Sequence, residues 1–258
     1  MESNSKITPE WISQAKLRGE RVAALTAYDY PTARLLDEAG VPLILVGDSV
    51  GMVVLGYPDT TQVTLAEMRH HVAAVARAKT RALVVGDLPY HTYQTAQNAV
   101  ANAHVLTEAG AEAIKLEGGV EVVPEIRAMR EAGIAVMGHI GMLPQHIKEE
   151  GGYKIKGRSE AEKELLLSDA LAVQEAGAFA IVLELVEPEL ARAITDKLSI
   201  PTIGIGSGSH CYGNILVTPD LVGAFPWFRP KFAVATADVA SAIRGAAEGF
   251  VKEVKNRP

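Results

Sequence analysis

Short apolar runs recur along the chain, and four of them follow the same tripeptide, Glu-Ala-Gly. A glycine after a helical stretch supplies the left-handed conformation that ends a helix. A short, almost continuous apolar run is typical of a parallel strand that is buried on both faces. The pattern therefore predicts four helix-to-strand units, with tripeptides at 38–40, 108–110, 131–133 and 175–177 and strands at 43–47, 113–116, 134–138 and 179–183.

Four further apolar runs raise the number of expected strands to eight, at 22–27, 82–86, 202–206 and 215–218. Helical patterns separate them. One begins at the capping box Thr64-Leu65-Ala66-Glu67, and others cover 95–109 and 159–176. An open doubly wound sheet also alternates strand and helix, but eight units in this length favour a closed (β/α)8 barrel of the TIM type. We expect an α/β fold with a single domain over 1–258, an N-terminal extension with a helix at 9–17, and a C-terminal helix at 233–254.

Composition narrows the partners and the compartment. The chain has 258 residues, a net charge of -6 and a single cysteine, Cys211. The acidic balance argues against nucleic acid as a partner, and one cysteine cannot form an intramolecular disulfide. The first residues lack the apolar stretch of a secretion signal, and no apolar run approaches the roughly 18 residues of a membrane helix. We therefore expect a cytoplasmic protein with no membrane partner.

Five polar residues directly follow apolar runs: Asp48, Asp87, Glu117, His139 and Glu184. Any one of them could simply cap a helix. In a barrel, however, the carboxyl ends of all strands converge on one face, where active sites are built. Five such residues in register, four of them acidic, favour a shared site. Because clustered carboxylates repel one another, the pattern predicts a bound cation.

Asp48 and Asp87 are the expected metal ligands, since oxygen ligands without nearby cysteines suit Mg²⁺. Mg²⁺ keeps positions open that a 2-oxo acid could fill. Glu117 could ligate the metal directly or hold metal-bound water. Lys115 lies two residues before Glu117, so both side chains should point into the barrel. There Lys115 could contact the substrate or a carboxylate partner, or form a structural ion pair with Glu117.

Glu184 ends an apolar run, so burial would raise its pKa and make it a competent general base. For His139, a hydrogen-bond donor to the substrate and a purely structural residue remain open alternatives. The glycine-rich stretch 204–208 either cradles an anion or only permits a tight turn.

Six ordered motifs, spread over about residues 8 to 250, resemble the ketopantoate (3-methyl-2-oxobutanoate) hydroxymethyltransferase family. They are Thr26-Ala27-Tyr28-Asp29, Val46-Gly47-Asp48-Ser49-Val50-Gly51-Met52, Gly86-Asp87-Leu88-Pro89, Ile114-Lys115-Leu116-Glu117-Gly118-Gly119, Gly138-His139-Ile140-Gly141 and Gly151-Gly152-Tyr153-Lys154.

The resemblance implies a TIM barrel of the phosphoenolpyruvate/pyruvate superfamily that uses Mg²⁺. It implies transfer of a one-carbon unit from 5,10-methylenetetrahydrofolate to 3-methyl-2-oxobutanoate in pantothenate biosynthesis. Asp48 and Asp87 match the family's metal ligands, Glu117 matches the acid that holds the metal's water, and Glu184 matches the proposed base. Ser49 and Lys115 match substrate-contacting positions, and with Asp48, Asp87 and His139 they form the expected substrate site. A homodecamer or another homo-oligomer is implied as well.

Several loop positions depart from the family pattern and are expected to rim the site: Tyr57, Gln62, Leu143, Lys156, Tyr212 and Asn214. They leave the proposed metal and base positions intact. The leading hypothesis is therefore the hydroxymethyltransferase. The alternatives are a paralogous Mg²⁺-dependent aldolase or lyase acting on another 2-oxo acid, and a barrel that only binds a metabolite or partner.

Overall fold

The computed structural model describes residues 5–257. Residues 1–4, part of the stretch that we interpreted as lacking a secretion signal, lie outside it. The chain divides into two compact units, one ending at Ile215 and one starting at Leu216. The interpretation of the whole chain as one domain stays a prediction. None of the described helices combines the length and apolar character needed to cross a membrane.

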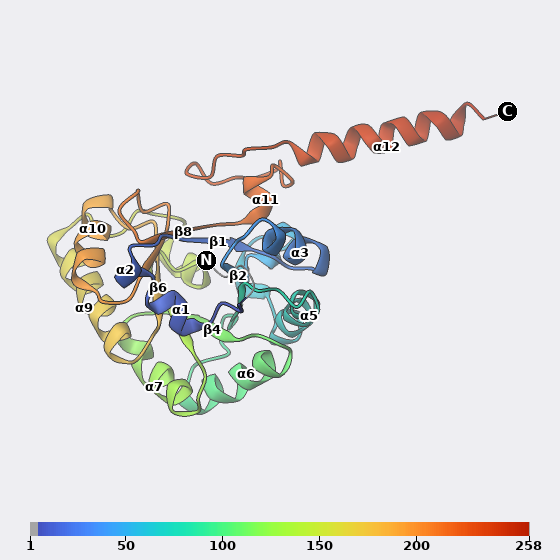
Figure 1. Ribbon diagram of the computed structural model, residues 1–258. Coiled ribbons are helices and arrows are strands. Elements are labelled where there is room, and N and C mark those ends of the chain that lie inside the picture. The colour runs from blue at the N-terminus through green and yellow to red at the C-terminus, as the bar shows by residue number, and fades with distance from the viewer. Residues whose placement is uncertain (1–4, 258) are drawn as a thin grey trace. The chain divides into compact units, whose positions relative to one another are not determined.

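The first unit is a closed barrel of parallel strands in the order β1 to β8, which confirms the predicted fold. In Figure 1 the strands lie at the centre and helices α3, α5, α6, α7, α9 and α10 surround them. The strands are β1 (Val22–Thr26), β2 (Leu43–Val46), β3 (Leu83–Asp87), β4 (Ala113–Glu117), β5 (Val136–Gly141), β6 (Ala180–Glu184), β7 (Thr202–Ile205) and β8 (Gly213–Leu216).

The three helices predicted between strands begin where the sequence indicated. The capping boxes at Thr64 and Ser159 are formed, and Thr95 caps the helix between β3 and β4. The helices are α1 (Pro9–Ser13), α2 (Ala15–Arg18), α3 (Tyr30–Glu38), α4 (Val50–Val53), α5 (Leu65–Ala76), α6 (Ala96–Glu108), α7 (Val123–Glu131), α8 (Ile147–Glu150), α9 (Glu160–Glu175) and α10 (Pro188–Lys197), with 3₁₀ turns η1 (Thr60–Gln62), η2 (Val120–Val122) and η3 (Pro144–His146).

Alternate strand residues face two different cores. The inner core fills the barrel with residues such as Leu43, Leu83 and Met137, and Ile12 of α1 packs against it. The outer core joins the strands to the surrounding helices through residues such as Ile44. This division follows from the two-residue period of a strand, which sends successive side chains to opposite faces.

The structure corrects three element predictions. The expected helix at 9–17 is two short helices separated at Gln14. Strand β8 starts and ends two residues earlier than predicted, because Thr218 already begins the helix α11 (Thr218–Leu221), with proline in its first turn. Residues 206–212, which join β7 to β8, contain no helix, since a helical crossover needs a dozen or more residues.

The second unit consists of α11, a connecting segment and the helix α12 (Val239–Lys255). The predicted terminal helix at 233–254 therefore begins later than expected. The side chain of Asp238 accepts a hydrogen bond from the backbone N–H of Ser241, which places the N-cap at residue 238. No residue of α12 is buried.

Candidate active site

Polar side chains replace apolar ones at the carboxyl end of the barrel interior. The inward-facing positions of β4 are Ala113, Lys115 and Glu117, and those of β6 end at Glu184. We predicted that these polar residues lie just past the strands, and this is wrong for Asp87, Glu117, His139 and Glu184. The backbone pairing continues through them, for example between Glu117 and His139. These side chains are therefore held by the rigid barrel wall.

Asp48 lies two residues beyond the end of β2 and turns toward β3. Its backbone N–H donates to Oδ2 of Asp87 at 3.3 Å, and both carboxyl groups are buried. The two residues expected to bind a metal are therefore neighbours, as the adjacency of β2 and β3 requires. Ser49 follows directly, and its Oγ lies 2.8 Å from the hydroxyl of Tyr28, two residues beyond β1.

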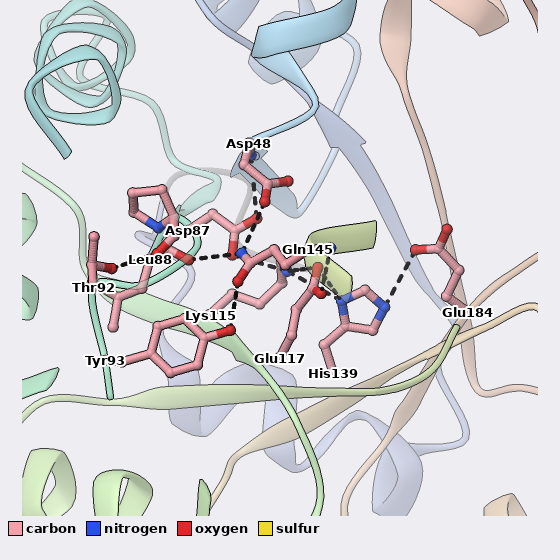
Figure 2. Close-up of polar contacts among 11 residues, drawn as sticks. Asp48, Asp87, Leu88, Thr92, Tyr93, Lys115, Glu117, His139, Gln145 and Glu184 are labelled. Carbon is pink, nitrogen blue, oxygen red and sulfur yellow. Dashed lines mark hydrogen bonds and ion pairs between the residues drawn. The ribbon is translucent and has the colours of Figure 1, made fainter. Parts of the chain in front are cut away.

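Lys115 lies at the centre of this cluster, as Figure 2 shows. Its Nζ lies 2.9 Å from Oδ1 of Asp87, 3.8 Å from Oε1 of Glu117 and 3.2 Å from Nδ1 of His139. Burial alone would lower the pKa of Lys115, but the carboxylates of Asp87, Glu117 and Asp48 raise it instead. Lys115 is therefore a permanent cation, and both of the ion pairs left open by the sequence, with a carboxylate partner and with Glu117, are present.

Glu184 lies on the other side of His139 from this cluster (Figure 2). Nε2 of His139 lies 3.3 Å from Oε2 of Glu184. Burial and the charge of Lys115 lower the pKa of His139 to about 4, so the ring is neutral at physiological pH. Since the Lys115 ammonium can only donate, it favours the tautomer in which Nδ1 accepts and Nε2 carries the hydrogen on the side of Glu184.

Burial also raises the pKa of the Glu184 carboxyl, while the His139 ring beside it opposes that rise. These opposing effects suit a general base, which must be ionised before it acts and basic enough to take a proton. Glu184 is followed by Leu185 in the left-handed region at a φ of 48°, which is strained for a branched side chain.

The charges of the cluster are not balanced by the protein. Asp48, Asp87 and Glu117 face one ammonium group, so the fully ionised cluster carries two excess negative charges. In the metal-free chain burial raises the pKa of all three carboxyls, that of Asp48 to about 7. A divalent cation would neutralise this excess, so the residues fit such an ion.

The described residues hold no group of three or more His, Cys, Asp and Glu side chains that would enclose a metal on its own. Mg²⁺ characteristically uses one or two protein carboxylates and keeps several waters. Asp48 and Asp87 would hold it, with Glu117 nearby.

One central residue was missed by the sequence analysis. Gln145, in the loop after β5, donates from its backbone N–H to Oε2 of Glu117 and from Nε2 to Oδ2 of Asp48. Tyr93 in turn donates to its Oε1. An uncharged amide gives no signal of charge clustering. Its position shortly after the carboxyl end of a strand, where loops reach the site, was the available indication.

The structure shows where several of the residues predicted to rim the site lie. The hydroxyl of Tyr57 donates to Glu67 in the first turn of α5, and Lys156 pairs with Glu150 at the end of α8. Tyr212 and Asn214 do not rim the site. Tyr212 donates to the backbone oxygen of Lys16 in α2, at the opposite end of the barrel, because the helix-free connection has already returned the chain to the start of β8.

The glycine-rich stretch 204–208 favours the turn over the anion cradle. Its Ser207 is buried, with Oγ donating to the backbone oxygen of Leu183 and accepting from the N–H of Val186. This hydroxyl therefore holds the segment after β7 against the end of β6 by hydrogen bonds.

Solved structures with the same fold are distant in sequence. A phosphonopyruvate hydrolase in complex with oxalate and Mg²⁺ superposes with a TM-score of 0.63 at 15% identity, covering 96% of this chain and 87% of that one. A 2,3-dimethylmalate lyase, described as a member of the PEP mutase/isocitrate lyase superfamily, gives a TM-score of 0.61 at 18% identity, covering 97% and 88%. At these identities the similarity shows the fold alone.

Closer relatives cover nearly the whole chain. Proteins named 3-methyl-2-oxobutanoate hydroxymethyltransferase are 53% identical in Chloroflexus aurantiacus strain J-10-fl, 52% in Moorella thermoacetica and 51% in Ignicoccus hospitalis. The matches span 97%, 99% and 97% of this chain and 89%, 96% and 95% of the relatives. The family model for ketopantoate hydroxymethyltransferase matches residues 6–258. With the barrel and its polar interior, these matches show that the chain belongs to the ketopantoate hydroxymethyltransferase family of enzymes.

Proposed function

We propose that this protein transfers a hydroxymethyl group from 5,10-methylenetetrahydrofolate to 3-methyl-2-oxobutanoate, giving 2-dehydropantoate for pantothenate biosynthesis in the cytoplasm. The observation that carries the proposal is a buried, net negative cluster of Asp48, Asp87 and Glu117 around Lys115, with a separate buried carboxyl, Glu184, beyond His139. This arrangement separates a cation site from a base, as enolisation of a 2-oxo acid requires.

The proposed ion is Mg²⁺, held by Asp48 and Asp87 with Glu117 beside them. When bound, it would polarise the keto group of the substrate and stabilise the charge that develops on its oxygen. Lys115 would add a positive charge in a water-poor interior, where such stabilisation is strongest. The Ser49 hydroxyl, positioned by Tyr28, would orient the substrate carboxylate.

The Glu184 carboxylate would remove the proton from C3 of the substrate. Water adds to the methylene carbon of the folate and both C–N bonds of that carbon break, so that tetrahydrofolate leaves and a formaldehyde-level carbon remains. The enolate carbon then forms a bond to this carbon, whose oxygen becomes the hydroxyl. The two nitrogens of the folate take up one proton from the water and, in net terms, the one removed from C3. His139 would hold Glu184 in place through Nε2–H and keep the carboxylate ionised between turnovers.

Proton exchange at C3 tests the base and the metal separately from the folate step. With Mg²⁺ and without folate, the wild-type protein should catalyse exchange of the C3 proton of 3-methyl-2-oxobutanoate for deuterium from the solvent. Glu184→Gln should slow this exchange by about 100-fold or more while keeping Mg²⁺ binding. Glu189→Gln, an exposed glutamate on α10, is the matched control. Full exchange in Glu184→Gln would show that the base is another group.

Formation of 2-dehydropantoate in the presence of 5,10-methylenetetrahydrofolate then separates the transferase from an aldolase or lyase of the same fold. Exchange without any folate-dependent product would favour the alternative. Cleavage of a related 2-oxo acid would establish it.

We further propose that the protein forms a homo-oligomer through α12. Ile243, Phe250 and Val254 are exposed at spacings that place them on one face of this helix, and none is buried within the chain. A second copy offering the same stripe would bury it symmetrically. Light scattering should show an assembly larger than a monomer that Phe250→Glu disrupts, whereas an unchanged mass would contradict this role.

A further inference from the structure

Gln145 combines contacts that no other part of the proposed mechanism uses. It lies in η3, in the loop between β5 and α9, and its residue is almost fully buried, with 1% of its surface exposed. Nε2 donates to Oδ2 of Asp48 at 2.9 Å and to the backbone oxygen of Leu88 at 2.9 Å. The backbone N–H donates to Oε2 of Glu117 at 3.1 Å. Both ends of one residue therefore hold carboxylates of the candidate metal site.

The orientation of the Gln145 amide is fixed by its surroundings. The Leu88 carbonyl can only accept a hydrogen bond, so the NH₂ group must face it, and the same NH₂ group then donates to Oδ2 of Asp48. On the other side, the hydroxyl of Tyr93 donates to Oε1 at 2.5 Å. Turning the amide over would place its oxygen against two acceptors and its NH₂ against the Tyr93 hydroxyl. Tyr93 therefore keeps the NH₂ group directed at Asp48 (Figure 2).

The hydrogen bond from Gln145 Nε2 also affects how the Asp48 carboxylate can bind a cation. Its Oδ2 accepts a hydrogen bond from a neutral donor, which fixes the rotation of the carboxylate and leaves Oδ1 the less engaged oxygen at this contact. A carboxamide donor adds no positive charge, unlike Lys115 beside Asp87, and so does not compete with the cation. Outer contacts of this kind commonly set ligand orientation and metal affinity.

Resting on the proposed function, we infer that Gln145, held by Tyr93, is a positioning residue that sets the affinity of the site for its divalent cation. Because Gln145 belongs to the loop after β5, tight cation binding requires that loop to be in the position in which Gln145 contacts Asp48 and Glu117. The chain Tyr93–Gln145–Asp48 thus joins the loops after β3 and β5 to the metal site.

Mn²⁺ binding to the full-length protein, followed by electron paramagnetic resonance without substrate, measures this directly. Gln145→Met keeps the length of the side chain and removes its donors. We expect it to weaken Mn²⁺ binding by about 10- to 100-fold, and Tyr93→Phe to weaken it by a smaller factor in the same direction. Tyr90→Phe is the matched control, because the Tyr90 hydroxyl donates to Glu149 of the same loop and reaches no proposed ligand. It should bind Mn²⁺ like the wild type.

A second readout separates positioning from a merely structural role. Saturating Mn²⁺ should restore most of the C3 exchange in Gln145→Met, since the defect lies in affinity. A structural defect would lower the thermal midpoint of the metal-free protein and leave the dissociation constant of the folded fraction unchanged.

The inference is overturned if the wild type binds Mn²⁺ and both variants bind it within twofold of the wild type. If Gln145→Met does not fold, Tyr93→Phe alone decides in the same way. A wild type that binds no Mn²⁺ would overturn the proposed metal together with this inference, so the two failures are distinguishable.

Discussion

Replacing Lys115 by methionine removes the positive charge from the centre of the buried cluster. Methionine retains most of the chain length, so the change is chiefly electrostatic. At an effective dielectric constant of about 20, opposite charges at the observed 2.9 Å to Asp87 and 3.8 Å to Glu117 attract with about 6 and about 4 kcal/mol. Much of this attraction only offsets the cost of burying the charges. Measured losses when one partner of a buried pair is removed are about 3–5 kcal/mol.

We therefore expect Lys115→Met to lower the free energy of unfolding of the metal-free protein by about 3–5 kcal/mol at pH 8. At pH 5 the loss should be smaller, because the carboxyls of Asp48 and Asp87, whose pKa values are raised by burial, can take up protons instead. Added Mg²⁺ should recover part of the loss, since a ligand at 100 times its dissociation constant contributes about 2.7 kcal/mol.

Urea denaturation at pH 5 and pH 8, with and without Mg²⁺, measures all of these effects. Lys163→Met is the matched control, because Lys163 pairs with Glu160 on the exposed face of α9 and its loss should hardly move the midpoint. If Lys115→Met has the same urea midpoint as the wild type at pH 8 without metal, Lys115 does not balance the cluster and the assignment of the site is wrong.

Two further predictions use the same assays. In the metal-free wild type, burial raises the Asp48 pKa from 3.8 to about 7, so the stability that this group contributes below pH 4 should be lost as the pH rises through 7. Mg²⁺ should therefore stabilise the protein most at pH 8. A higher urea midpoint at pH 8 than at pH 5 without metal would contradict this prediction. Gly141→Ala should destabilise by more than about 1 kcal/mol and slow C3 exchange, because at a φ of +99° its Cβ would lie 2.3 Å from the backbone oxygen of Glu184. Gly152→Ala, at a φ of +110° with open space around it, controls for backbone strain, and equal exchange rates in both variants would refute the role of the close contact.

The barrel was predictable because its strands are buried on both faces and therefore appear as apolar runs. The ends of the strands were less predictable. We took the first polar residue as the end of each strand, whereas hydrogen bonding of the backbone continues through Glu117 and His139. A polar side chain ends an apolar run but does not end a strand when other polar side chains meet it inside the barrel.

The charged members of the candidate site were also recognisable, since acidic residues at successive strand ends must converge in a closed barrel. Gln145 was not, because its place depends on the path of a loop that no periodic pattern describes. The same limit applies to Tyr212. Its distance from the site follows from a connection that lacks a helix, and the alternation of the preceding elements suggested otherwise.

The backbone conformation of Leu185 lowers the stability of the folded enzyme. The conformation that it adopts directly after Glu184 costs a branched residue on the order of 1 kcal/mol, which glycine would not incur. Selection for heat resistance alone should therefore favour asparagine at this position, because asparagine enters the left-handed region more easily than leucine and avoids the entropic cost of glycine. If the strained peptide unit holds Glu184 in place, such a variant would gain thermal stability and lose turnover, so the two properties would be opposed at this one position.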